Sequence, residues 1–273
     1  MSVDYIFIFL AGLGGGFLAG LLGIGGGVIY ILILPLALQE VGVAEQEIAQ
    51  YVIANSIFGT MAASLFGSIT LIRDNDFYWK DVATVGFSGV VISYLLLFFF
   101  VNTPYYSEST FNIAVIVFLV LILFTSFNKS RYQLFFKNPV SNHKAWYIFT
   151  GGTAGAMAAL SGLGGGTVVV PLLKSGLHMN IKRAKSISLG VILITSALMT
   201  LFNMLDEPAH VFQGSSLGYI VFPVVIPLSV GVVLSSPLGV KVSNKISSRI
   251  ISYIFAGFLL LVIARKIIAL IQS

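Results

Sequence analysis

The chain has 273 residues, of which 57% are hydrophobic and only 9% are charged, and its formal net charge is +5. A soluble domain carries roughly 25% charged residues, so this composition places the chain in a lipid bilayer. The chain has no cysteine, its three histidines lack a partner at metal-binding spacing, and no catalytic constellation appears. We therefore expect no enzymatic activity, no metal, no cofactor and no nucleic-acid partner.

The first apolar segment, residues 3–38, is too long for one straight transmembrane helix. Its 36 residues would extend about 54 Å at 1.5 Å per residue, whereas a bilayer core is about 30 Å thick. The glycine-rich stretch "GLLGIGGGVIY" lies near its middle, which predicts a break at Gly23–Gly27. Three ordinary spans are then expected, at residues 48–71, 80–101 and 109–127.

The second half of the chain repeats this order. Residues 146–177 form another long apolar segment, with "ALSGLGGGTVVVPLLKSGL" at residues 159–177. A turn is expected at Gly162–Gly166. Three further ordinary spans are expected, at residues 184–203, 217–238 and 250–271.

The basic residues give the orientation, because cytoplasmic loops are rich in lysine and arginine. Thirteen of the fifteen basic residues fall in four loops, 72–81, 128–145, 174–185 and 239–249. The other three loops carry acidic residues and no basic ones: 39–47, 102–108 and 204–216. Since basic loops flank residues 146–177 on both sides, this segment must enter and leave on the same side, as a hairpin. By analogy, residues 3–38 form a hairpin from the outer side.

A hairpin followed by three spans thus occurs twice. The first membrane repeat covers residues 1–127 and the second residues 146–273, joined by a basic cytoplasmic linker at 128–145. The glycines match at an offset of 139, and Ser56 matches Ser188 at an offset of 132. Each half crosses the membrane an odd number of times, so the halves are inverted. The expected fold is an all-α polytopic membrane protein of two inverted repeats, an architecture of secondary transporters.

Three stretches of the sequence carry a family resemblance: "GLLGIGGGVIY", "GLGGGTVVVPLL" and "KRAKSISL". Together they resemble the sulfite exporter TauE/SafE family, also called the toluene-sulfonate uptake permease family. The resemblance extends over almost the whole chain. It implies transport of small sulfur oxyanions or organosulfonates, such as sulfite, thiosulfate or sulfoacetate. It leaves the substrate and the direction open, because the family includes exporters and importers.

The glycine clusters are the first candidates for substrate contact. A helix that resumes after a break begins with amide groups that lack intrahelical partners and carry the positive end of the helix dipole, which suits an anion. The expected anion-binding glycines are Gly25, Gly26, Gly27, Gly164, Gly165 and Gly166. Close helix packing is the alternative role for them. Packing is favoured for the glycines spaced by four, which are Gly12, Gly16, Gly20, Gly151 and Gly155.

Polar side chains near these clusters complete the expected substrate site. They are Ser161, Thr167, Asn55, Ser56 and Ser188. A buried hydroxyl in a membrane helix also bonds its own backbone, and that alternative stays open for each of them. Helix–helix hydrogen bonding is the alternative for Asn55.

The expected function is a secondary carrier of a small sulfur-containing anion, working by alternating access as a multi-pass protein of the cell (inner) membrane. The alternatives are an anion channel and a carrier for a non-sulfur organic anion. The expected partners are the anion and the lipid bilayer, with a homodimer possible. Proton-coupled carriers often use intramembrane carboxylates. The expected spans hold none away from their ends, which leaves a span end such as Asp81 as a coupling position.

Overall fold

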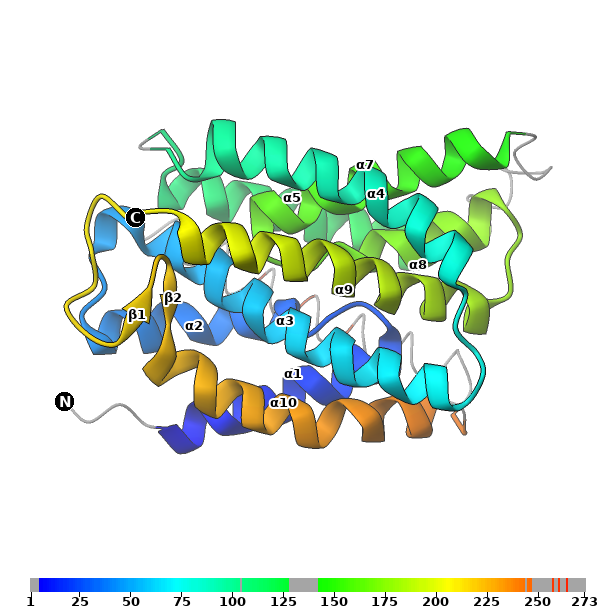
Figure 1. Ribbon diagram of the computed structural model, residues 1–273, viewed down its shortest axis with the longest axis horizontal. Coiled ribbons are helices and arrows are strands. Elements are labelled where there is room, and N and C mark those ends of the chain that lie inside the picture. The colour runs from blue at the N-terminus through cyan, green and yellow to red at the C-terminus, as the bar shows by residue number, and fades with distance from the viewer. Residues whose placement is uncertain are drawn as a thin grey trace.

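The computed structural model describes residues 5–103, 105–127, 142–243 and 245–246, together with single residues 257, 260 and 264; the side chains of 121–127 and 175 are not described. These residues form a bundle of helices that run along its long axis (Figure 1). The helices are α1 (Tyr5–Leu22), α2 (Gly27–Val41), η1 (Glu45–Glu47), α3 (Ile48–Arg73), α4 (Trp79–Leu96), η2 (Leu97–Val101), α5 (Glu108–Phe127), α7 (His143–Ser161), α8 (Gly166–Gly176), α9 (Ile181–Leu205) and α10 (Phe222–Ser243). Two short strands, β1 (Ser216–Leu217) and β2 (Ile220–Val221), precede α10.

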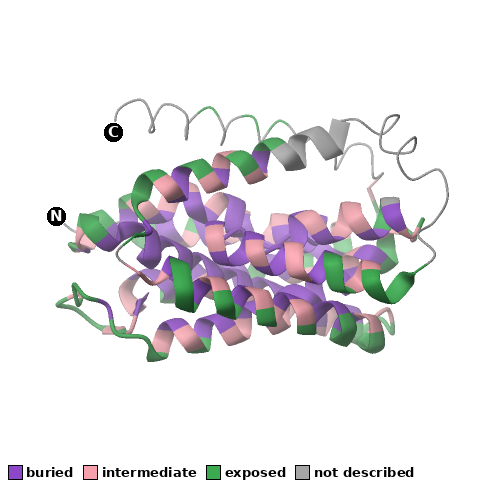
Figure 2. Cartoon of the chain, turned by 90° about the horizontal axis from the view of Figure 1, so that it is seen from above, coloured by how far each residue is buried: buried purple, intermediate pink, exposed green. Residues whose placement is uncertain are grey.

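Five of the described helical segments are long and apolar enough to cross a membrane. They are α1, η1 with α3, α4 with η2, α9 and α10. Large apolar side chains point outward from the bundle, such as Phe87 and Phe99, which are 74% and 69% exposed. Figure 2 shows buried residues concentrated in the middle of the bundle. Such an outward apolar surface suits lipid, and the all-α polytopic membrane fold is confirmed.

Four expected spans are helices within a few residues of their predicted bounds, as α3, α4 with η2, α5 and α9. The span expected at 217–238 was placed about five residues too early. Residues 216–221 instead form an antiparallel hairpin in which Ser216 pairs with Val221. Gly218 turns this hairpin at a φ of +55°, a conformation that glycine adopts without strain. The expected span 250–271 lies outside the described residues, apart from the three single positions.

Both long apolar segments break and fold back at their glycines. In the first, α1 ends at Leu22 and α2 begins at Gly27, and Gly15 of α1 lies against the ring of Tyr30 in α2. In the second, the indole nitrogen of Trp146, near the start of α7, donates to the carbonyl of Leu172 in α8 at 3.0 Å. The two expected hairpins are therefore present, and their bends are here called the first tip (Gly23–Gly26) and the second tip (Gly162–Gly165).

The hairpins also pack across the two halves of the chain. Helix α1 lies along α10, and α7 lies along α4, with α3 and α9 between these pairs (Figure 1). A Cβ on Gly12 would lie 2.1 Å from the carbonyl oxygen of Leu228, and a Cβ on Gly155 would lie 2.1 Å from that of Gly89. Only glycine permits such close helix contact, so the packing role expected of the glycines spaced by four is confirmed.

Candidate functional site

The two glycine tips meet in the interior of the bundle. A Cβ on Gly27 would lie 2.5 Å from the carbonyl oxygen of Gly162, and a Cβ on Gly166 would lie 2.9 Å from that of Gly23. The second tip borders Thr60, halfway along α3, and Gly166 borders Ile192, halfway along α9. The contact therefore lies near the middle of the two central helices, and the two halves approach each other reciprocally.

The backbone of the tips explains part of the glycine requirement. Gly23 and Gly162, which match at the sequence offset of 139, have φ values of +69° and +67°. Gly25 and Gly164, another pair at this offset, have φ values of +79° and +81°. Residues with a Cβ rarely adopt this left-handed region. Glycine at these positions allows each chain to reverse in a few residues without strain.

The tips present amide groups that have no acceptor among the described residues. In the part of the chain that the structure describes, the amides of Gly25, Gly26 and Gly27 make no hydrogen bond, and neither do those of Gly164 and Gly165. These amides lie at the starts of α2 and α8, where the helix dipole is positive. The arrangement can bind an anion through the backbone.

One of the expected anion-binding glycines differs from the others. The amide of Gly166 already donates to the carbonyl of Gly164 at 2.8 Å. Its contribution to the site is therefore the close approach to Gly23, and its donor is used inside the second tip.

Ser56 and Ser188 form a reciprocal pair of hydrogen bonds between the halves. Ser56 on α3 donates to the carbonyl of Gly162 at 2.8 Å, and Ser188 on α9 donates to that of Gly23 at 2.6 Å. Both serines are fully buried. Both hydroxyls thus donate their hydrogens to backbone carbonyls, and each serine holds the tip that belongs to the other half.

This geometry makes a prediction for stability. Replacing Ser56 or Ser188 with alanine is expected to lower the free energy of unfolding by about 1–3 kcal/mol, because each change leaves a buried carbonyl without its donor. Ser64→Ala is the matched control, since the hydrogen bond that the buried Ser64 makes within the described residues goes to the carbonyl of Met61 in its own helix. The midpoint of thermal unfolding of detergent-purified protein measures the effect. Equal midpoints for Ser64→Ala and the two tip variants would contradict it.

The other expected side chains are also engaged within the protein. The Asn55 amide donates to the carbonyls of Tyr51 and Tyr219, and its oxygen accepts from the amide of Val221, so Asn55 fastens the β1–β2 hairpin to α3. Asn55 thus bonds other parts of the protein, as the helix–helix alternative expected, but its distant partners lie in the β1–β2 hairpin and not in a second helix.

The two polar residues beside the second tip share one neighbour. Ser161 donates to the carbonyl of Met157, one turn earlier in its own helix, at 2.6 Å. Thr167 donates to the sulfur of the same Met157 at 3.1 Å. The backbone alternative therefore describes Ser161, and the hydroxyl of Thr167 is likewise engaged within the protein.

Two buried hydroxyl groups beside the tips were missed by the sequence reasoning. Thr60 lies against both Gly25 and Gly164, and Tyr30 lies against Gly26. Both side chains are fully buried, and neither hydroxyl has a hydrogen-bond partner among the described residues. A signal for Thr60 existed, because residues 56, 60, 64 and 68 carry hydroxyls at four-residue spacing and so share one face of α3.

The family of the chain follows from its similarity to known proteins. The sequence pattern of the sulfite exporter TauE/SafE family matches residues 8–265. The chain belongs to this family. It is 27% identical over 237 residues to a probable membrane transporter protein of Methanocaldococcus jannaschii, covering 86% of this chain and 84% of the relative. It is also 27% identical over 257 residues to a probable membrane transporter protein of Haemophilus influenzae, covering 93% and 94%. No solved structure matches the chain.

The family membership supports a multi-pass membrane transporter, in agreement with the helical bundle.

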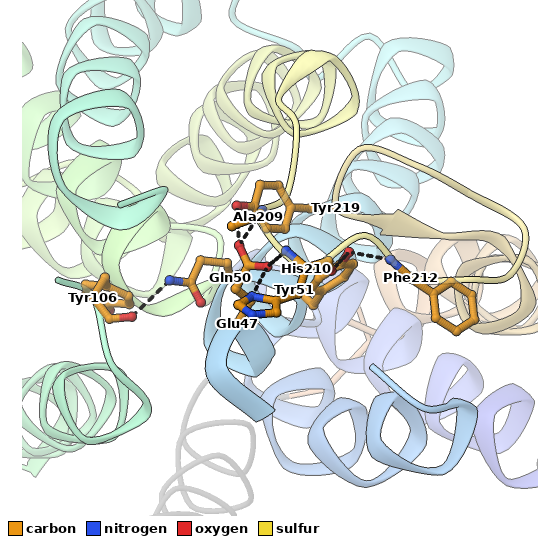
Figure 3. A network of polar contacts seen from close by, with 8 residues as sticks. All are labelled: Glu47, Gln50, Tyr51, Tyr106, Ala209, His210, Phe212 and Tyr219. Atoms are coloured by element: carbon orange, nitrogen blue, oxygen red, sulfur yellow. Dashed lines mark hydrogen bonds and ion pairs between the residues drawn. The ribbon is translucent and has the colours of Figure 1, made fainter. Parts of the chain in front are cut away.

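In this TauE/SafE chain, a buried carboxylate organises the end of the bundle that the charge pattern assigns to the outside. Glu47 accepts from the amides of Ala209 and His210, at 3.1 and 2.5 Å, and from the hydroxyl of Tyr219 at 3.0 Å (Figure 3). Burial and the Glu47 charge raise the pKa of Tyr219, so its hydroxyl keeps its proton and donates. Glu47 therefore fastens the loop before α10 to the start of α3.

An ion pair joins the halves at the opposite end of the TauE/SafE bundle. Arg183 on α9 donates to Asp81 on α4, with nitrogen–oxygen distances of 2.7 and 3.1 Å. The side chain of Arg183 is 44% exposed and that of Asp81 is 16% exposed. Asp81, the span-end carboxylate considered for coupling, is thus paired with a cation of the other half.

Proposed function

We propose that the chain is a secondary carrier for a small anion of the sulfur oxyanion or sulfonate class, working in the cell (inner) membrane. The observation that carries this proposal is the meeting of the two tips, where the amides of Gly25–Gly27 and Gly164–Gly165 have no acceptor in the part of the chain that the structure describes. Family membership favours sulfur anions over other anions. A sulfite or sulfonate group offers three oxygens, which suits several amide donors from two directions.

The chemistry of the site fits an anion that must enter and leave. Hydrogen bonds from neutral amides to an anion are stronger than those between neutral groups, and a dry interior strengthens them further. They also require no buried arginine, which would be costly to insert in a membrane. The site would therefore bind an anion through neutral donors, and no permanently charged group would hinder its release.

The interlocked halves support alternating access as the mechanism. We propose that residues 1–127 and 146–273 are inverted repeats, joined by the linker at 128–145. The reciprocal contacts support this, since α1 pairs with α10 as α7 pairs with α4, and Ser56 and Ser188 each hold the opposite tip. Movement of one half against the other would then open the tips first to one side and next to the other.

Ligand binding and flux test the proposal. Sulfite, thiosulfate or sulfoacetate is expected to raise the thermal midpoint of the purified protein, because a ligand that binds the native state stabilises it, whereas acetate is expected to have no effect. Proteoliposomes should then show saturable uptake of the stabilising anion. Stabilisation by acetate alone would favour a carrier for non-sulfur organic anions. Single-channel currents in a planar bilayer would replace the carrier with a channel.

A further inference from the structure

We propose that the hydroxyl of Thr60 donates a hydrogen bond to the transported anion and helps to determine which anions are accepted, an inference that rests on the proposed function. Thr60 would be the side-chain ligand in a site otherwise built from backbone amides. The ligand class is an oxyanion with at least one oxygen directed toward α3.

The state of the Thr60 hydroxyl is the first argument. The residue is fully buried, and its oxygen has no hydrogen-bond partner among the described residues. Buried polar groups are nearly always hydrogen-bonded, because leaving one unpaired is costly. An anion held between the tips would supply the missing acceptor.

The position of Thr60 is the second argument. Its methyl carbon lies 2.5 Å from where a Cβ on Gly164 would lie and 2.9 Å from the corresponding position on Gly25, and its oxygen lies 3.5 and 3.8 Å from the same two positions. Thr60 therefore borders both tips at once, in the middle of α3. The unpaired hydroxyl of Tyr30 differs in this respect, because it borders Gly26 and Gly15 within the first hairpin.

The repeat provides the third argument, through an asymmetry. At the offset that relates Ser56 to Ser188, Thr60 corresponds to Ile192, which lies against Gly166. At this pair of positions, α3 thus presents a hydroxyl-bearing side chain to the tips, whereas α9 presents a hydrocarbon side chain. Such a site would orient an anion with one polar end, whereas a site with hydroxyls on both sides would not.

Binding to matched variants tests the role of Thr60. Thr60→Val keeps the side-chain shape and removes the hydroxyl, and Thr60→Ser keeps the hydroxyl. Thr200→Val is the matched control, since Thr200 is also buried and its hydroxyl also lacks a partner among the described residues. It lies about 12 Å further along α9 than Ile192. The dissociation constants for sulfite, thiosulfate and sulfoacetate are measured by thermal stabilisation of purified protein.

Thr60→Val is expected to weaken binding by about 10-fold or more, since a hydrogen bond to a charged group is lost. Thr60→Ser and Thr200→Val are expected to bind like the wild type, and the unliganded Thr60→Val protein should be at least as stable as the wild type, because the change removes a buried hydroxyl that lacks a partner. If Thr60→Val fails to fold, Thr60→Ala gives the same comparison.

Three other results would overturn the role of Thr60. Wild-type binding by Thr60→Val would overturn the role of Thr60 and leave the proposed function standing. Equal weakening by Thr60→Val and Thr200→Val would also overturn it, because the effect would then belong to any buried threonine. If the wild type binds none of these anions, the proposed function fails together with this inference.

Discussion

Replacing Gly27 with alanine is expected to weaken anion binding strongly while the protein stays folded in the membrane. Gly27 is the first residue of α2 and does not have a positive φ, so alanine fits its backbone. Its Cβ, however, would lie 2.5 Å from the carbonyl oxygen of Gly162 and would force the tips apart. An anion that bridges the tips would then lose the donors of one of them.

The expected size of this effect follows from the donors involved. Each hydrogen bond to a charged group contributes about 1.5–3 kcal/mol, so losing two weakens binding by about 100-fold or more. Saturable uptake of sulfite or thiosulfate into proteoliposomes measures it, with reconstituted protein quantified. Gly86→Ala is the control, since a Cβ there meets its nearest neighbour, Ile194, at an ordinary 3.4 Å. Normal uptake by Gly27→Ala would place the anion site away from the tips.

Replacing Glu47 with alanine is expected to cause the largest loss of stability, by at least about 3 kcal/mol. The change removes a carboxylate that accepts two backbone amides and the Tyr219 hydroxyl, and hydrogen bonds to a charged group contribute about 1.5–3 kcal/mol each. The loop before α10 would lose its attachment to α3. Glu47→Gln should lie between the wild type and Glu47→Ala, because it keeps the shape of the side chain without the charge.

Two measurements examine the Glu47 prediction together. The thermal midpoint reports the global loss, and amide hydrogen exchange of residues 206–221 reports release of the loop. Glu45→Ala is the control, because Glu45 lies in the same short helix and its side chain is exposed. Unchanged exchange in Glu47→Ala would show that other contacts hold the loop.

Much of the fold was predictable because its signals are local. The length of residues 3–38 and 146–177 exceeds the bilayer thickness, and the glycine clusters mark where helices break most readily. Loop charge then decided that residues 146–177 return to the side they came from. The start of α10 was misplaced because residues 217–221 are apolar enough to resemble a span, while their pairing across Gly218 depends on a turn that hydropathy does not register.

The details of the site were harder to predict because they depend on contacts between the halves. The repeat identified Ser56 and Ser188 as equivalent, but not that each donates to the opposite tip. Thr60 was missed because its equivalent, Ile192, is apolar, so a comparison of the two halves gave it no weight. That the Thr60 hydroxyl lacks a partner among the described residues can be seen only in the three-dimensional structure, where the neighbouring donors and acceptors are placed.

The pairing of α1 with α10 has a consequence for how the protein is made. Helix α1 leaves the ribosome before α10, the helix that covers its glycine face, and about two hundred residues of chain separate the two. Helix α7, in contrast, finds α4 already synthesised. During translation the closest packing surface of the first hairpin therefore stays uncovered in the bilayer until α10 has been inserted.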